Sequence, residues 1–156
     1  MNEAVVTFLA SFAIWILFAG LFILWLIDGR IKKEVALHAL ASAAFAWVVS
    51  EMIKSLIPSL RPFETNGLSP LTLTVPAGGT FPSGHASTAF AMATAVWLHD
   101  KKIGLFFFLG AIGVGLGRIM GNVHFPLDVF GGVLVGVSVA YILGKLHLFK
   151  AFSKRN

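Results

Sequence analysis

The sequence predicts an all-α, polytopic membrane protein, a helical bundle with about five transmembrane helices. Hydrophobic residues make up 57% of the 156 residues and charged residues only 12%, whereas soluble domains have roughly 45–50% apolar and about 25% charged residues. The apolar residues also gather in five runs separated by short polar segments. The length favours one membrane-embedded domain over residues 1–156. The absence of Cys excludes disulfides and thiolate chemistry.

The first apolar run, Val5–Ile27, has 23 residues without a charge, which is long enough to cross a ~30 Å hydrocarbon core. Because no basic segment precedes it and no clear cleavage site follows it, we expect a retained helix and not a signal peptide. The second run, Val35–Ile57, should end at Pro58, since proline interrupts a helix.

Three shorter runs complete the predicted bundle, and their length suggests tilt or local thinning of the bilayer. They are Pro82–Leu98, Ile103–Met120 and Pro126–Leu146. Small residues recur at every fourth position within them, which predicts close approach of helix backbones. The three stripes are Ser83, Ser87, Ala91 and Ala95; Gly132, Gly136, Ala140 and Gly144; and Gly113, Gly117 and Gly121.

The basic residues divide unequally between the two predicted sides of the membrane. Nine lie on the side of segments 28–34, 99–102 and 145–156, and three lie on the other: Lys54, Arg61 and Arg118. The positive-inside rule predicts that the first side is cytoplasmic and that the N-terminus is outside. The net charge of +5 is then explained by topology and lipid headgroups, and we expect membrane lipids and no nucleic acid as partners.

The three outer cations suggest a site for a multiply charged anion. Each of them alone could instead reach lipid headgroups from a helix end. Their segments, however, also lead to the two histidines of the outer side, His85 and His124. Arginine offers a planar fork that fits phosphate oxygens and lysine offers a compact charge, so the group favours phosphate.

The stretch "FPSGHAST", residues 81–88, is interpreted as a phosphate cradle. If Pro82 is the first helical residue, the backbone N–H groups of Ser83, Gly84 and His85 are among those that the helix leaves unpaired. A helix N-terminus with such free N–H groups binds anions. An ordinary helix start also explains Pro82 and Ser83.

His124 and Asp128 suggest covalent chemistry. They are four residues apart, so the carboxylate could reach a ring nitrogen across one turn, fix the tautomer and leave the other nitrogen free. A histidine oriented in this way can attack phosphorus, and His85 can protonate the leaving oxygen. Asp128 could equally be a first-turn carboxylate that complements the helix dipole, and both roles can hold together.

The stretches "KSLIPSLRP", "PSGH" and "GRIMGNVHFPLD" resemble the three motifs of the type 2 phosphatidic acid phosphatase family. This resemblance covers about Lys54 to Asp128 and implies a metal-independent phosphatase without a cofactor. It implies His124 as the nucleophile that forms a phosphohistidine, Asp128 as its orienting partner and His85 as the general acid. The phosphate ligands that it implies are Lys54, Arg61, Ser83, Gly84 and Arg118.

Two departures from the family pattern stand out. Gly117 takes the place of the usual Ser before the second Arg, so one hydroxyl contact to phosphate is missing unless a backbone N–H replaces it. Family members commonly have six spans, and five are expected here. The outer carboxylates are scattered, which argues against a metal site, and Glu51 is expected to pair with Lys54.

A site at the outer interface suits a lipid phosphate. The resemblance to small bacterial members suggests undecaprenyl diphosphate and the bacterial cytoplasmic membrane, with phosphatidylglycerol phosphate, phosphatidic acid and lipid A 1-phosphate as alternatives. The apolar loop Asn66–Phe81 is expected to border the path of the lipid. Two other classes compete: vanadate-dependent haloperoxidases, which share the motifs but are soluble, and a non-catalytic lipid-phosphate-binding protein or transporter. The sequence leaves the oligomeric state open.

Overall fold

The computed structural model describes residues 2–27 and 30–146. Within these residues all regular structure is helical, which confirms the predicted all-α membrane bundle. The helices are α1 (Glu3–Ser11), α2 (Ala13–Leu26), α3 (Arg30–Leu56), α4 (Pro62–Asn66), α5 (Gly84–His99), α6 (Lys101–Met120) and α7 (Pro126–Lys145). The basic positions Arg30, Lys32, Lys150, Lys154 and Arg155 lie outside the residues whose side chains are described.

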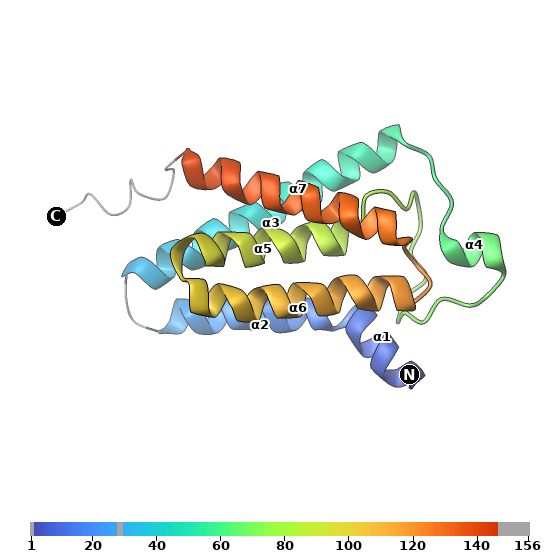
Figure 1. Cartoon of the computed structure of the whole chain (residues 1–156), viewed down its shortest axis with the longest axis horizontal. Helices are drawn as coiled ribbons and strands as arrows, with labels where there is room; N and C mark the ends of the chain where they lie inside the picture. Colours follow the sequence, from blue (N-terminus) through green and yellow to red (C-terminus); the bar gives the residue numbers. More distant parts are fainter. Residues whose placement is uncertain (1, 28–29, 147–156) are drawn as a thin grey trace.

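Five helices, α2, α3, α5, α6 and α7, run along the long axis of the molecule (Figure 1). One end of this bundle carries α4, the short segment 57–61 before it, the long loop 67–83 after it and residues 121–125, and we call it the α4 end. The opposite end carries the tight connection between α5 and α6, where Asp100 accepts the backbone N–H groups of Lys102 and Ile103. This carboxylate cap explains why α6 begins two residues before the predicted run.

Helix α5 lies at the centre and packs against α3, α6 and α7. Its contact with α7 is made by the two small-residue stripes that the sequence predicted. A Cβ atom at Gly132 would lie 2.7 Å from the carbonyl oxygen of Ser83, and one at Gly136 would overlap the carbonyl of Ser87. Larger residues at these glycines would push the helices apart, so the stripes fix the distance between α5 and α7.

The first apolar run, which was predicted as one span, is not one straight helix. It is divided at Phe12 into α1 and α2, which meet at an angle of 48°. In a continuous helix the carbonyl of Ala10 would accept a hydrogen bond from the N–H of Ile14. Here it accepts a hydrogen bond from Nη1 of Arg118, at 2.8 Å. The Ser11 hydroxyl also accepts the N–H of Leu73 in the long loop. The bend therefore coincides with contacts that hold α1 against α6 and the loop.

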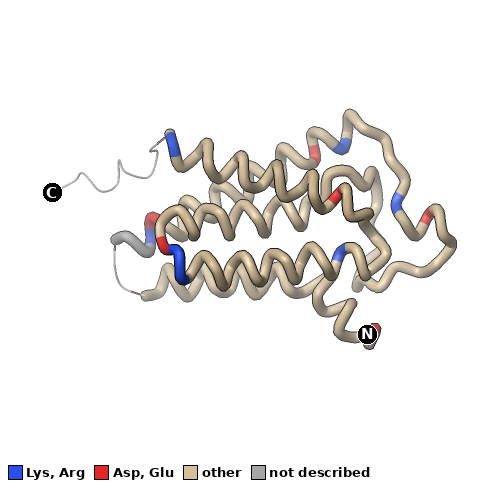
Figure 2. The backbone as a smooth tube through the Cα atoms, viewed as in Figure 1, with Lys and Arg blue, Asp and Glu red and all other residues tan. Residues whose placement is uncertain are grey.

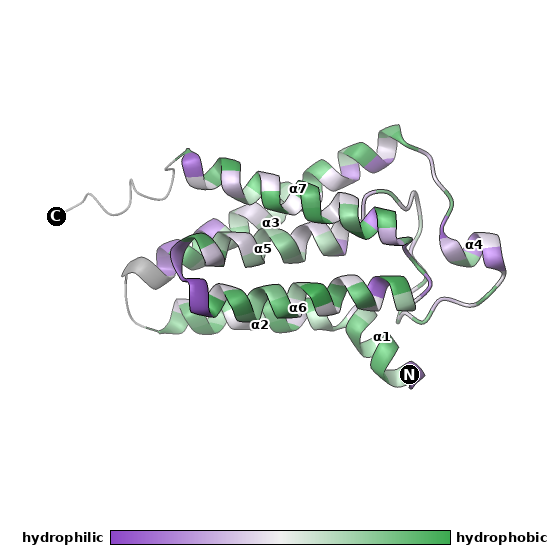
Figure 3. Ribbon diagram, in the orientation of Figure 1, coloured by the Kyte–Doolittle hydropathy of each residue, from purple (hydrophilic) through white to green (hydrophobic). Residues whose placement is uncertain are grey.

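By length and composition, three of the described helices could cross a membrane, or four if the bent pair counts as one span. Helix α5 has 16 residues, fewer than a spanning helix usually needs, so five spans remains a prediction. Large apolar side chains cover the outside of the bundle, among them Phe22, Leu26, Phe106 and Leu127. Figure 3 shows that the helices are hydrophobic over most of their length and hydrophilic near their ends. The protein is an integral membrane protein.

Charged residues lie near the two ends of the bundle (Figure 2). At the opposite end, Lys101 and Lys102 begin α6 and Lys145 ends α7; all three are exposed. Two of the three cations of the α4 end are held differently, because Arg61 and Arg118 are only 3% and 5% exposed, whereas Lys54 is partly exposed. Burial of two guanidinium groups requires specific partners for their N–H donors.

Candidate active site

His124 lies in the connection between α6 and α7 and is 3% exposed. The backbone carbonyl of Arg118, in the last turn of α6, accepts the N–H groups of both Val123 and His124. The end of one helix therefore fixes the backbone of His124, and the following Pro126 begins the next helix. The imidazole is held between two packed helices and not on a loose loop.

Asp128 accepts two short hydrogen bonds through one carboxylate oxygen, Oδ2. The donors are the backbone N–H of Phe125, the N-cap of α7, and the hydroxyl of Thr80, each at 2.6 Å. Oδ2 also faces His124 Nδ1, but at 3.6 Å, which is too long for a hydrogen bond. Asp128 is therefore the first-turn carboxylate of α7 and a neighbour of His124, but the direct hydrogen bond to the ring nitrogen that the sequence suggested is not formed.

Thr80 fills the space between the two side chains. Its Oγ1 lies 3.1 Å from His124 Nδ1, and the residue is 2% exposed. Sequence reasoning did not identify Thr80. Its contacts reach 44 and 48 residues along the chain, and no local pattern distinguishes it from an ordinary loop threonine.

Arg61 brings a guanidinium to the other nitrogen of the imidazole, with Nη1 3.5 Å from His124 Nε2. The remaining N–H groups of Arg61 donate to four backbone carbonyls, those of Ala77, Gly78, Gly79 and Val123. Arg61 thus ties loop 77–79 to the turn before His124 and directs a single donor toward Nε2.

Burial lowers the pKa of His124 to about 4, the carboxylate of Asp128 opposes this shift, and the charges of Arg118 and Arg61 add to it. The imidazole is therefore neutral at physiological pH. Burial also lowers the pKa of Arg61, while Glu64, Asp128 and Glu51 oppose the shift; the guanidinium stays charged. The site thus combines an unprotonated histidine with fixed positive charge.

The start of α5 differs from the prediction in one respect. The first helical residue is Gly84, and Ser83 is the N-cap, so Pro82 lies outside the helix. The Ser83 N–H donates to the carbonyl of Asp128 at 2.9 Å, which removes it from the predicted cradle. Among the described residues, the backbone N–H groups of Gly84 and His85 have no partner, and they remain the donors of this helix start.

Lys54, near the end of α3, pairs with Glu51 at 2.6 Å, as predicted. A Cβ atom at Gly84 would lie 3.4 Å from both Lys54 Nζ and Glu51 Oε1. The absence of a side chain at Gly84 therefore lets the lysine approach the start of α5. This contact brings the first predicted motif against the second.

Arg118 is buried, and its Nη1 is held by the carbonyl of Ala10. Its Nε has no hydrogen-bond partner in the described chain. A buried and unpaired guanidinium N–H is costly, and an anion would satisfy it. Arg118 lines a pocket of about 250 Å³ together with His85, Trp15 and part of the long loop, including Thr72 and Pro76.

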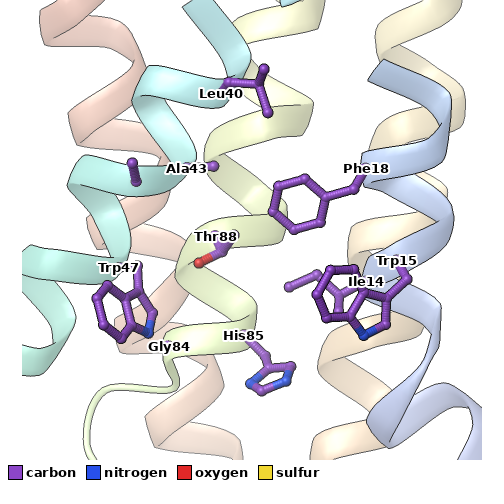
Figure 4. A pocket seen from close by; sticks show the side chains of 10 residues that line it. Ile14, Trp15, Phe18, Leu40, Ala43, Trp47, Gly84, His85 and Thr88 are labelled. Atoms are coloured by element: carbon purple, nitrogen blue, oxygen red, sulfur yellow. The ribbon is translucent and has the colours of Figure 1, made fainter. Parts of the chain in front are cut away.

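A second, larger pocket of about 460 Å³ meets the first at Trp15 and His85. Figure 4 shows α2 on one side, α3 on the other and α5 behind, with His85 toward one end of the pocket and Leu40 toward the other. Its walls are mostly apolar: Ile14, Trp15, Phe18, Leu40, Ala43, Ala44, Trp47, Gly84, His85 and Thr88. An apolar groove thus leads along the bundle to His85.

The structure brings all eight predicted site residues to the α4 end. Contacts link Lys54 to Gly84, Ser83 to Asp128, and Arg61 to His124, and one pocket joins His85 to Arg118. The described residues contain no group of three or more His, Cys, Asp or Glu that could hold a metal ion. The arrangement offers several donors to an anion beside a neutral histidine.

Comparison with known proteins agrees with this chemistry, because the sequence model of the PAP2 superfamily matches residues 35–151. The chain belongs to the PAP2 superfamily. It is accordingly a phosphatase of this membrane-embedded class. The match begins within α3, so it leaves out the bent pair α1–α2.

Named relatives of this PAP2 member are similar over most of its length. The bacitracin transport permease protein BcrC of Bacillus licheniformis is 31% identical over 88% of this chain and 68% of its own. The undecaprenyl-diphosphatase BcrC of Bacillus subtilis is 24% identical over 90% of this chain and 72% of its own. The crystal structure of Aquifex aeolicus LpxE superimposes with a TM-score of 0.72, at 29% identity, over 92% of this chain and 83% of that one.

Gly117, the position where this PAP2 chain departs from the family's Ser, has a structural explanation. A Cβ atom there would lie 2.5 Å from the carbonyl carbon of Leu9 and 2.6 Å from the nitrogen of Ala10. The glycine therefore allows α1 to pack on α6, where the Ala10 carbonyl reaches Arg118. Gly117 lies inside α6, where backbone N–H groups are used by the helix, so it does not offer the substitute donor considered from sequence.

Proposed function

We propose that this protein removes the terminal phosphate from a lipid diphosphate, undecaprenyl diphosphate, through a phosphohistidine on His124, at the outer face of a bacterial cytoplasmic membrane. One observation carries the proposal. A buried imidazole has one nitrogen bound to a hydroxyl–carboxylate pair and the other beside a guanidinium, next to an apolar groove that ends at His85.

The first step forms a bond between His124 Nε2 and phosphorus. The Nε2 lone pair attacks, the bond from phosphorus to the bridging oxygen breaks, and its electron pair stays on that oxygen, which takes a proton from His85. Undecaprenyl phosphate leaves. Arg61, Arg118 and Lys54 stabilise the charge of the transferring phosphoryl group.

In the second step water attacks the phosphohistidine. The neutral His85 takes a proton from the water, the new oxygen–phosphorus bond forms, and the bond to Nε2 breaks. Inorganic phosphate is released, while His124 recovers its lone pair and His85 its proton. The backbone N–H groups of Gly84 and His85 and the Ser83 hydroxyl are the remaining proposed phosphate ligands.

A lipid substrate is supported by the groove between α2 and α3. Trp15 and Trp47 on its two sides are 64% and 54% exposed, so they face the surrounding membrane and frame an opening toward acyl or isoprenyl chains. The phosphate-binding residues lie at the end of the bundle, where headgroups are found. A chain that enters between α2 and α3 would therefore carry its phosphate to His85.

Phosphate release from purified protein tests this proposal. Undecaprenyl diphosphate, phosphatidylglycerol phosphate, phosphatidic acid and lipid A 1-phosphate are supplied in detergent, with and without EDTA, and the His124→Ala variant serves as the background control. We expect EDTA-resistant release that is fastest with undecaprenyl diphosphate. Faster phosphate release from another lipid would identify that lipid as the preferred substrate. Release from none of them would favour a binding protein or transporter.

The outer location is supported by the basic residues at the opposite end of the bundle. We expect a reporter fused after Asn156 to be active only in the cytoplasm, and a tag placed before Met1 to be accessible from outside intact cells. The reverse pattern would turn the active site toward the cytoplasmic leaflet.

A further inference from the structure

Three buried side chains form a chain of hydrogen bonds that ends at the proposed nucleophile. Thr80, His124 and Asp128 are 2%, 3% and 4% exposed. The direct distance from His124 Nδ1 to Asp128 Oδ2 is 3.6 Å, whereas Thr80 Oγ1 is 3.1 Å from the former and 2.6 Å from the latter. The imidazole therefore contacts the carboxylate through the hydroxyl.

The number of hydrogen atoms shared by Thr80, His124 and Asp128 decides which group donates in each of these hydrogen bonds. Asp128 Oδ2 already accepts the N–H of Phe125, as expected of an ionised carboxylate, which can only accept. Thr80 has one hydroxyl hydrogen and must donate it to Asp128. Its oxygen is then an acceptor toward the ring, so His124 Nδ1 carries a hydrogen and Nε2 has a free lone pair.

We propose that Thr80 is a positioning residue that relays the charge of Asp128 to His124 and selects the tautomer with a reactive Nε2. This inference rests on the proposed function for its role in turnover. When Nε2 bonds to phosphorus, the ring becomes cationic and keeps its hydrogen on Nδ1. The Thr80 oxygen and the carboxylate behind it then stabilise this charge.

The position of Thr80 is itself fixed by contacts that do not involve the relay. Its backbone N–H donates to Ser59 Oγ at 3.1 Å, and the N–H of Phe81 donates to the same oxygen at 3.3 Å. The loop before α5 is thus tied to the chain before α4. Because this tie uses backbone N–H groups, a change of the Thr80 side chain leaves it in place.

Three variants separate the hydroxyl from the shape of the side chain. Thr80→Val removes the hydroxyl at nearly constant volume, and Thr80→Ser keeps it. Thr94→Val makes the same chemical change at another buried threonine, in α5, whose hydroxyl has no partner among the described residues. For Thr80→Val we expect kcat to fall about 10–100-fold, by analogy with the loss on removing an outer partner of a metal-binding histidine, with KM changed less than about threefold.

Thr80→Ser is expected to keep kcat within about threefold of the unchanged protein, and Thr94→Val to keep it fully. A Thr80→Val protein of normal thermal stability and unchanged kcat would overturn the relay. So would a Thr80→Ser protein as slow as Thr80→Val, because that result would assign the effect to the lost methyl group.

Nitrogen-15 NMR of the imidazoles tests the tautomer without any turnover. The His124 signals are assigned by their disappearance in His124→Ala. We expect a hydrogen on Nδ1 in the unchanged protein and in Thr94→Val, and a mixture of tautomers in Thr80→Val. An unaltered tautomer in Thr80→Val would contradict the proposal. If no lipid is hydrolysed, the proposed function fails while this measurement still decides the arrangement of the relay.

Discussion

The two ends of the bundle each contain a buried histidine, and the two are held in different ways. At the opposite end, His38 is 1% exposed, with Nδ1 3.0 Å from His99 Nε2 and Nε2 3.1 Å from the carbonyl of Ala140. At the α4 end, His124 uses Nδ1 in the Thr80–Asp128 chain and directs Nε2 toward Arg61. Burial alone therefore does not indicate chemistry.

What distinguishes the two histidines is the partner of the second nitrogen. The carbonyl of Ala140 can only accept, so His38 Nε2 carries a hydrogen there, and its Nδ1 accepts from His99. Both nitrogens of His38 are thus used to join α3, α5 and α7. The Nε2 of His124 instead faces a donor and retains its lone pair for a phosphorus atom. The predictions below test this difference.

The largest difference in turnover is expected between two variants in which one of the two histidines is replaced. His124→Ala removes the nucleophile and the two-step path with it, so turnover should fall by more than about 10³-fold. His38→Phe fills a similar volume, and turnover per folded molecule should stay within about twofold. Phosphate release and thermal unfolding are measured on both purified variants. More than a few per cent of activity in a monodisperse His124→Ala protein would refute the assignment.

Asp128→Asn is expected to reduce turnover strongly, but by about 10- to 100-fold less than His124→Ala does. An amide cannot stabilise the imidazolium, and its NH₂ group can reverse the hydrogen bond with Thr80 and so favour the other tautomer. Turnover with saturating lipid checks this prediction. An unchanged turnover number would leave Asp128 only its place at the start of α7.

Arg118→Lys keeps the charge and removes the planar fork. We expect turnover and inhibition by orthovanadate to weaken together, each by roughly 10–100-fold, because both depend on the same stabilisation of equatorial oxygens. Lys102→Arg, at the opposite end of α6, is the matched control and should change neither. If Arg118→Lys leaves both quantities at their original values, Arg118 does not bind the transferring group.

The smallest effect concerns the protonation of His124. Its pKa of about 4 lies below the ordinary value of about 6.5, so folding favours the neutral ring. Between pH 6.5 and 4 the unfolded chain binds a proton that the folded chain does not, and this group therefore makes the fold less stable as pH falls through that window. NMR titration of the ligand-free protein should show no midpoint for His124 above about pH 5. A His124 titration midpoint near pH 6.5 would contradict this prediction, because it would mean that the ring is exposed to water.

Sequence reasoning succeeded where the contacts follow local spacing. The stripes of α5 and α7 meet as their four-residue period predicts, Glu51 pairs with Lys54 across one turn, and Asp128 faces His124. It failed where distant segments decide the structure. The hydroxyl of Thr80, the loop carbonyls around Arg61 and the break at Phe12 depend on contacts across 16 to 108 residues. A linear pattern does not contain such pairings.

The apolar pattern also did not locate the short helix α4 or the first residue of α5. Helix α4 begins after Arg61, whose backbone N–H donates to Glu64, in a segment that the apolar pattern assigned to a loop. Ser83 is the cap of α5: its side-chain oxygen accepts the N–H of Ala86, as is usual for serine at this position, and its own N–H donates to the carbonyl of Asp128. The apolar pattern therefore misses helix ends that depend on capping contacts within one turn and, at α5, on a further hydrogen bond to Asp128.

The hydrogen bond from Arg118 to Ala10 indicates that the functional part of this enzyme includes α1. The signature motifs lie between Lys54 and Asp128, and the superfamily match starts at residue 35. Yet α1 supplies the carbonyl that holds a proposed phosphate ligand, and α2 supplies Ile14, Trp15 and Phe18 to the groove. A shortened gene product that starts at α3 would retain every motif and lose one side of its lipid path. For protein engineering and for domain annotation, the functional part of the chain therefore begins upstream of the residues that the superfamily model matches.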